Sequence, residues 1–160
     1  MTQIVPIESQ HDEAICRIIK SVGEEFGAVG DGFGPSDAEV LAMSTHYTEA
    51  TKSLYLVALL EGEVVGGGGI ASFNASHETC ELKKLFLLPR GRGQGIGKQI
   101  TEQCLAFAKT QGYAQCYLDT LSNMTAAISL YESVGFAHRQ KPLAATPHGN
   151  CNVWMMKNLS

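Results

Sequence analysis

The sequence contains the stretch Leu85-Phe86-Leu87-Leu88-Pro89-Arg90-Gly91-Arg92-Gly93-Gln94-Gly95-Ile96-Gly97-Lys98. Residues 85–88 are continuously apolar, which is typical of a strand that is buried on both faces. Pro89 has no N–H group for a sheet ladder, so the strand is expected to end there. Glycines then occupy alternate positions from Gly91 to Gly97, and glycine lets backbone N–H groups turn toward a ligand without a side chain in the way. The stretch therefore predicts a strand, a glycine-rich turn and the start of a helix.

The helix after the turn is predicted from the spacing of its apolar residues, and Gly112 is a suitable residue to end it. The start of a helix carries unpaired N–H groups and about half a positive charge from the helix dipole. Arg92 and Lys98 add full positive charges beside it, so we predict a binding site for a phosphate group. The apolar positions of the helix are Ile96, Ile100, Cys104, Phe107 and Ala108.

Two common phosphate motifs do not fit this turn. A Walker loop requires G-x-x-x-x-G-K-[ST], whereas Lys98 is followed by Gln99 and lacks the glycine spacing. The dinucleotide motif G-x-G-x-x-G fails in both registers, because Ile96 or Lys98 stands where its last glycine belongs. On this stretch alone, a plain connection between a strand and a helix stays open as an alternative.

The length and charge of the chain limit its class and its partners. A chain of 160 residues predicts one domain over residues 1–160. The net charge is −4 and no basic run is present, so neither nucleic acid nor an anionic membrane surface is expected as a partner. The longest apolar run, residues 54–60, is too short to span a bilayer, and the first residues lack the apolar run of a signal peptide. We therefore expect a cytoplasmic protein.

The cysteines and histidines do not form a recognisable metal motif. The five cysteines are widely spaced, without C-x-x-C, and the five histidines lack the H-E-x-x-H pattern. We expect no metal site, and we expect the cysteines to be small buried residues in a reducing compartment.

Strands and helices are predicted to mix an antiparallel part with one strand–helix–strand crossover. A short helix at residues 37–43 is expected to be capped by Ser36, and Asn123 or Thr125 is expected to cap the helix near residue 125. The expected strands are residues 2–7, 54–60, 63–72, 79–88, 114–120, 136–141 and 151–159, and the other helices span about 12–26, 96–111 and 124–134.

Four consecutive glycines, residues 66–69, lie inside one of these expected strands. Glycine weakens a strand, so a reason for the run is needed. Either another backbone or a ligand approaches closely there, or the strand is bulged and flexible.

Two segments resemble motifs of the GNAT superfamily, the acyl-CoA-dependent N-acyltransferases. Arg92-x-x-Gly95-x-Gly97, directly after a strand, resembles the pyrophosphate motif of that superfamily. Residues 127–136 resemble its second motif, A-x-x-L-Y-E-x-x-G-F. The resemblance covers essentially the whole chain in its order of elements. It implies an α/β (α+β) fold with a mixed, largely antiparallel sheet of about seven strands and about four helices.

The resemblance also implies an activity: an N-acetyltransferase that transfers an acetyl group from acetyl-CoA directly to a primary amine of a small molecule, peptide or protein, without a metal. In the family, the central strand pairs with the pantetheine arm and the glycine loop wraps the pyrophosphate. These roles fall on the main chain of Leu85, Phe86 and Leu87, on the amides of Gly93, Gln94, Gly95, Ile96, Gly97 and Lys98, and on the side chains of Arg92 and Lys98.

Candidate catalytic residues follow from the same resemblance. Tyr131 matches the tyrosine that donates a proton to the leaving sulfur, and its ordinary pKa of about 10 suits that role. Glu81 and Asp119 stand where different members place a base; water alone, or a purely structural role for both carboxylates, stays open. The asparagine that many members place seven residues before the tyrosine is Met124 here. Asn123, one residue earlier, either contacts CoA or caps a helix.

The acceptor amine carries no motif in this sequence. In the superfamily the region after the first helix often covers the acceptor site, which makes Phe26, Phe33 and Tyr47 candidate contacts; aromatic packing is the alternative. Two other functions remain: a non-catalytic acyl-CoA-binding or sensing module on the same fold, and a nucleotide-binding oxidoreductase, which the failed dinucleotide motif disfavours. The oligomeric state stays open, although a homodimer is the commonest assembly.

Overall fold

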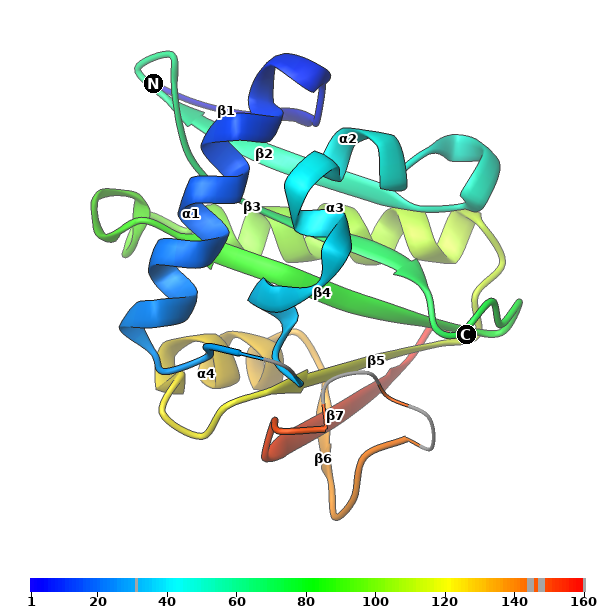
Figure 1. Cartoon of the computed structure of the whole chain (residues 1–160). Helices are drawn as coiled ribbons and strands as arrows, with labels where there is room; N and C mark the ends of the chain where they lie inside the picture. Colours follow the sequence, from blue (N-terminus) through cyan, green and yellow to red (C-terminus); the bar gives the residue numbers. More distant parts are fainter. Residues whose placement is uncertain (31, 144–145, 147–148, 160) are drawn as a thin grey trace.

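The central element of the structure is one seven-stranded sheet (Figure 1). The structure is a computed structural model that describes residues 1–30, 32–143, 146 and 149–159. Neighbouring strands run antiparallel except β4 and β5, which are parallel, so the predicted mixed and largely antiparallel sheet is confirmed. Across the sheet the strands are β1 (Thr2–Pro6), β2 (Leu54–Leu60), β3 (Glu63–Ser72), β4 (Thr79–Leu87), β5 (Gln115–Thr120), β7 (Val153–Asn158) and β6 (Ala137–Arg139).

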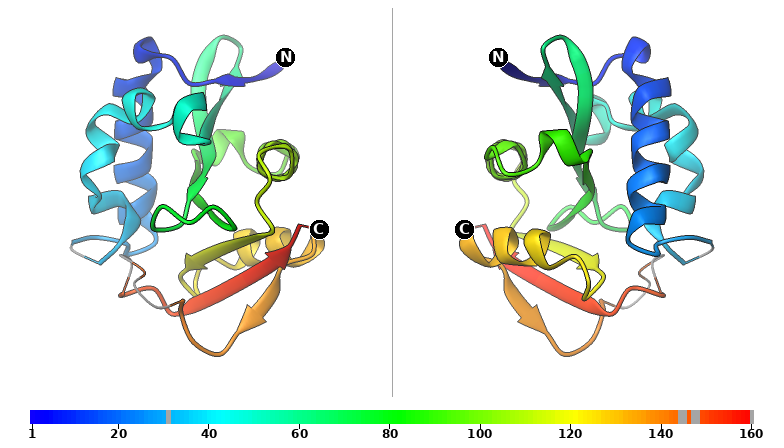
Figure 2. Two further views of the ribbon diagram at one scale, coloured as in Figure 1. Left: turned by 90° about the vertical axis from the view of Figure 1, so that its right-hand side faces the viewer. Right: turned by 90° about the vertical axis from the view of Figure 1, so that its left-hand side faces the viewer.

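The helices cover both faces of this sheet (Figure 2). α1 (Asp12–Glu25) and α2 (Met43–His46) lie on one face, and α3 (Ile96–Thr110) and α4 (Thr125–Ser133) lie on the other. Each face has its own apolar core, one around Ile19 of α1 and one around Ile100 of α3, and both side chains are fully buried. The predicted apolar stripes of the two long helices are therefore the faces that pack on the sheet.

The segment predicted as one short helix at residues 37–43 has a different structure. A 3-10 helix, η3 (Ala38–Ala42), leads into α2, and another 3-10 turn, η2 (Gly34–Ser36), precedes it. Ser36 is not the cap; Asp37 occupies the capping position, but its side chain makes no capping bond. The Asp37 carboxylate instead pairs with Lys84 of β4, a long-range contact that local spacing does not reveal.

The predicted caps of α4 are also wrong. Met124 stands at the capping position, and no side chain makes a capping hydrogen bond there. Asn123 instead donates from Nδ2 to the carbonyl of Phe26, which ends α1. The remaining 3-10 turns, which the sequence analysis did not foresee, are η1 (Ser9–His11), η4 (Glu49–Thr51) and η5 (Pro89–Gly91).

The four glycines of β3 lie where neighbouring groups leave no room for a side chain. A Cβ atom at Gly67 would lie 2.6 Å from the Tyr55 ring, and one at Gly68 would lie 2.7 Å from the Leu85 side chain. The register between β3 and β4 also shifts between Gly67 and Gly69. The run therefore combines close approach with a bulge, and protein side chains take the space that glycine leaves.

β4 and β5 separate after a short pairing, as Figure 1 shows. Their register runs from Thr79 opposite Gln115 to Glu81 opposite Tyr117 and then ends. β5 continues beside β7 as far as Thr120, whereas β4 continues beside β3. Within the described residues, β4 thus has no strand partner on the β5 side beyond Glu81.

We predict that Gly67→Ala destabilises the protein. The new Cβ would lie 2.7 Å from the Leu56 carbonyl oxygen as well as against the Tyr55 ring, and the backbone oxygen cannot rotate away. Overpacking of this kind costs about 2 kcal/mol, which corresponds to a fall in Tm of about 4–8 °C for a domain of this size. Thermal unfolding followed by circular dichroism measures the change.

The matched control is Gly149→Ala, because nothing lies within 4 Å of a Cβ atom at Gly149. Its Tm should stay within about 1 °C of the wild type, since surface substitutions away from packed groups change stability little. Equal Tm values for the two variants would contradict the packing argument.

Candidate active site

A groove of about 470 Å³ runs along the open edge of β4, a volume in the range of small-molecule sites. Its walls come from the end of α1, from β4, from the loop that enters α3 and from the start of α4. Of the residues predicted to bind the cofactor, Leu85, Phe86, Leu87, Arg92, Gly93, Gly95, Gly97, Lys98 and Asn123 line it. Ile96 is buried in the core, and the Gln94 side chain donates to the carbonyl of Arg90.

The loop at the start of α3 presents its backbone N–H groups. Gly93 and Gly95 have φ values of 76° and 79°, in the left-handed region that glycine adopts without strain. Gly95 is the capping residue of α3, and no side chain caps the helix there. Within the described part of the chain, the N–H groups of residues 93–98 have no hydrogen-bond acceptor. The site therefore combines free donors with the positive end of a four-turn helix.

Arg92 connects this loop to the end of α1. Its guanidinium makes two hydrogen bonds of 2.8 Å to the Glu25 carboxylate and one of 3.0 Å to the Leu87 carbonyl, and it lies 5.5 Å from the centre of the Phe26 ring. The hydrogen bonds from Arg92 hold the pKa of Glu25 below its usual range. Sequence reasoning missed Glu25, since it lies 67 positions from Arg92 and belongs to no motif.

Asn123 holds the same end of α1 from the opposite wall of the groove. Its Nδ2 donates to the Phe26 carbonyl over 2.9 Å. The end of α1 is thus fixed both to the glycine loop and to the loop before α4. The Phe26 ring forms part of the groove wall beside Val22.

A narrower cavity of about 60 Å³ continues from the groove into the gap between β4 and β5. Leu85, Phe86 and Met124 line both spaces, so the two adjoin. The three predicted catalytic residues, Tyr131, Glu81 and Asp119, all line the narrow cavity. The structure therefore brings together side chains from β4, β5 and α4 that are far apart in the sequence.

Tyr131 reaches this cavity from α4. Its side chain is buried and packs edge-to-face against Phe136, with ring centres 5.9 Å apart. Among the described residues its hydroxyl has no hydrogen-bond partner, and burial raises its pKa above the usual value, with a smaller contribution from Cys116. The hydroxyl therefore stays protonated and available as a donor at neutral pH.

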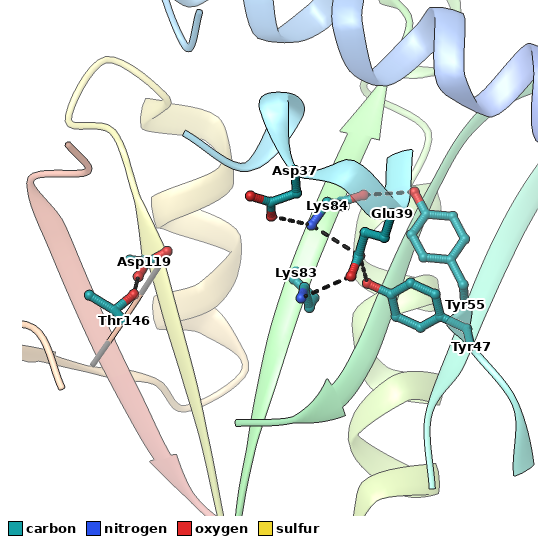
Figure 3. Close-up of polar contacts among 8 residues, drawn as sticks. All are labelled: Asp37, Glu39, Tyr47, Tyr55, Lys83, Lys84, Asp119 and Thr146. Atoms are coloured by element: carbon teal, nitrogen blue, oxygen red, sulfur yellow. Dashed lines mark hydrogen bonds and ion pairs between the residues drawn. The ribbon is translucent and has the colours of Figure 1, made fainter. Parts of the chain in front are cut away.

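Glu81 and Asp119 occupy different positions in the cavity wall. Glu81 is buried on β4 at the last paired position with β5. Asp119 accepts a hydrogen bond from the Thr146 hydroxyl, as Figure 3 shows, and another from the Tyr117 hydroxyl over 3.3 Å. Burial, followed by the charge of Asp119, raises the pKa of Tyr117 above its usual value.

The three aromatic residues considered as acceptor contacts separate in the structure. Phe33 lines the narrow cavity, whereas Phe26 lines the groove beneath Arg92. Tyr47 is buried, and its hydroxyl donates a hydrogen bond to Glu39. Of the three, Phe33 is the one that lines the cavity of the candidate catalytic residues.

Cys151 also lines the narrow cavity, but its surroundings oppose a nucleophilic thiolate. Burial raises its pKa to about 12, helped by the negative charges of Asp119, Glu81 and Asp37. A nucleophilic cysteine requires the opposite environment, in which a positive charge or a helix N-terminus lowers the pKa.

Metal and membrane features were sought over the described part of the chain. No cluster of three or more histidine, cysteine or acidic side chains suited to a metal occurs there. Within the same residues, no helix combines the length and the apolar character needed to cross a bilayer.

Comparison with known proteins identifies the same family over most of the chain. The sequence model of the acetyltransferase (GNAT) family matches residues 23–136. The uncharacterized N-acetyltransferase YjgM of Escherichia coli (strain K12) is 38% identical over 152 residues, which cover 94% of this chain and 90% of that protein.

Solved structures agree on the fold. A GNAT-family acetyltransferase from Staphylococcus aureus Mu50 superimposes with a TM-score of 0.84 at 18% identity, over 100% of both chains. The structure of yncA from Salmonella typhimurium, solved with its cofactor acetyl-CoA, gives a TM-score of 0.79 at 20% identity, over 100% of this chain and 95% of that one.

We predict that Cys151 reacts slowly with iodoacetamide in the folded protein. With a pKa of about 12, only about one thiol in ten thousand is ionised at pH 8. Alkylation of Cys151 at pH 8, followed by peptide mass spectrometry, should be at least about 100-fold slower than in the denatured chain, where an ordinary cysteine has a pKa of about 8.5. Because the pKa is raised, the folded-state rate should still increase above pH 9. A rate that levels off near pH 9 would contradict this environment.

Proposed function

The chain belongs to the acetyltransferase (GNAT) family of acyl-CoA-dependent enzymes, and we propose that it transfers an acetyl group from acetyl-CoA directly to a primary amine of a small molecule or a peptide. The observation that carries the proposal is the set of free N–H groups at residues 93–98, at the entrance of α3 and beside the open edge of β4. Such a helix entrance favours a phosphate group through both its donors and its dipole.

The groove has the features that coenzyme A requires of a protein. The loop amides supply donors for a pyrophosphate, and Lys98 adds a positive charge beside them. Among the described residues, no strand pairs with the β5 side of β4 at residues 85–87, which supports main-chain pairing there with the amide groups of a pantetheine arm; the Leu87 carbonyl already accepts a hydrogen bond from Arg92. We propose that the acyl end lies where the groove meets the narrow cavity.

Transfer requires a neutral amine and a stabilised leaving thiolate. The amine nitrogen forms a bond to the thioester carbon, the carbon–sulfur bond breaks, and the proton lost by the amine ends on the sulfur. We propose that the Tyr131 hydroxyl donates a hydrogen bond to the departing sulfur. A thiolate is a weaker base than a tyrosinate, so Tyr131 is protonated before and after the reaction. As its proton moves to the sulfur, Tyr131 takes up the proton that the amine releases.

The step that deprotonates the incoming amine is proposed for Glu81, for Asp119 or for water. Glu81 and Asp119 line the same cavity as Tyr131, which supports a role for either of them as the base. Direct transfer needs no acyl-enzyme, and the raised pKa of Cys151 supports that view.

A panel of amines tests the proposed function. Purified protein is given acetyl-CoA with aspartate, lysine, spermidine or a short peptide with a free N-terminus, and the released thiol is measured. We expect thiol release that depends on at least one amine, with one N-acetyl product per thiol. S-acetylpantetheine, which lacks the pyrophosphate, should be at least about 100-fold less effective in kcat/KM, because two charge-assisted hydrogen bonds are worth about 3 kcal/mol or more.

Two results would contradict this proposal. Absence of heat on calorimetric titration with acetyl-CoA would show that the groove does not bind the coenzyme. Equal efficiency of acetyl-CoA and S-acetylpantetheine would show that the loop amides bind no pyrophosphate.

We predict that Tyr131→Phe lowers kcat by about 100-fold, the lower end of general acid–base contributions. The KM for acetyl-CoA should change less than about twofold, because the ring and its packing on Phe136 remain. Steady-state kinetics with the best amine of the panel measures both. An unchanged kcat would remove Tyr131 from the mechanism.

A further inference from the structure

Lys84 stands at a bulge in β4, and the bulge changes which way two successive side chains point. Its φ of 56° is in the left-handed region, and the β3–β4 register shifts opposite it, between Gly67 and Gly69. Successive side chains of a regular strand point to opposite faces. Here Lys83 and Lys84 both reach Glu39 on the same face, since a bulge re-aims the side chains around it.

The Lys84 ammonium group is buried between two carboxylates (Figure 3). Its side chain is 1% exposed, and Nζ lies 2.8 Å from Asp37 Oδ2 and 3.0 Å from Glu39 Oε2. The same Glu39 oxygen, Oε2, accepts a hydrogen bond from the Tyr47 hydroxyl. The other oxygen of Glu39, Oε1, lies 3.5 Å from Lys83 Nζ. Burial opposes the ionisation of Glu39, but the charges of Lys84 and Lys83 outweigh it and lower its pKa.

The main chain of Lys84 is held separately. The buried hydroxyl of Tyr55 donates to the Lys84 carbonyl over 2.8 Å. The bulge and the ion pairs are therefore two distinct features at one residue, and a substitution that changes the side chain alone can separate them.

The ion pairs attach a particular segment to β4. Residues 33–42, here called the covering segment, contain η2 and η3, and they supply both Asp37 and Glu39. Phe33, Gly34 and Pro35 of this segment line the narrow cavity opposite Asp119 and Tyr131. The position of that wall therefore depends on how the covering segment is fixed.

We propose that Lys84 is a positioning residue whose ion pairs with Asp37 and Glu39 hold the covering segment against β4 and thereby set the width of the acceptor cavity. This inference rests on the proposed function for the role of the cavity. The groove lining includes Arg92, Gly93 and Lys98 of the loop, and it includes none of the ion-paired residues Asp37, Glu39 and Lys84. Loss of the ion pairs should therefore weaken the binding of the amine and leave the binding of acetyl-CoA unchanged.

The test uses two variants. Lys84→Met keeps the length of the side chain and the same backbone strain but removes the charge. Lys84→Met leaves two partly buried carboxylates without this cation. A second variant therefore combines Lys84→Met with Asp37→Asn and Glu39→Gln, which removes the uncompensated negative charge. Leu105→Ala is the control, since Leu105 is a buried core residue of α3 on the opposite face of the sheet.

Hydrogen exchange gives a readout that does not require activity. In both variants we expect backbone amides of residues 34–42 to exchange at least about tenfold faster than in the wild type, with residues 93–98 unchanged. Leu105→Ala should lower Tm without a selective change in residues 34–42. Unchanged exchange of the covering segment, or the same increase in Leu105→Ala, would overturn the proposal.

Kinetics gives the second readout. The KM for the best amine of the panel should rise at least about tenfold in both variants, because a displaced cavity wall no longer holds the amine in position. The calorimetric Kd for acetyl-CoA should stay within about twofold. An amine KM equal to the wild type, or an equal loss of acetyl-CoA affinity, would also overturn the proposal. If no amine is turned over by any protein, the proposed function fails, and hydrogen exchange still decides the role of Lys84.

Discussion

The constraint on which the site depends is the early end of the pairing between β4 and β5. After Glu81 meets Tyr117, the two strands separate, and each keeps its other neighbour. In the described part of the chain, no strand pairs with the backbone donors and acceptors on this open edge of β4. Main-chain polar groups at an unpaired strand edge can pair with an added chain, so this edge suits a ligand that carries amide groups of its own.

The rest of the structure keeps this opening in shape. Within the sheet, glycines 66–69 leave room for side chains on both faces, for Tyr55 in the core beside α1 and for Leu85 beside α3, and the β3–β4 register shifts at the same place. On the groove side, Arg92 and Asn123 fix the end of α1 as one wall. The catalytic candidates then come from three elements that meet at the narrow cavity, and none of these elements could form the site alone.

Local sequence patterns predicted most of the elements. The hairpin of β2 and β3 has the predicted bounds, because its apolar runs flank Glu61-Gly62, and both residues have the positive φ of a tight turn. The entry to α3 followed from its glycines and apolar spacing. The short helix at 37–43 was wrong, because Asp37 is committed to Lys84, 47 positions away in the sequence. Glu25 and Glu39 were missed for the same reason: their partners are set by the fold and leave no trace in periodicity.

The two-point contact between Arg92 and Glu25 has a consequence for how the groove meets its ligand. Two cationic side chains, Arg92 and Lys98, line the groove, and the Glu25 carboxylate already balances the charge of Arg92. The long-range pull on an approaching anion then comes from one cation, Lys98, while the peptide dipoles, whose field decays more steeply with distance than that of a free charge, add to it at close range. Capture from afar is correspondingly weak, and recognition is concentrated at close range, where direction and shape discriminate between one polyanion and another.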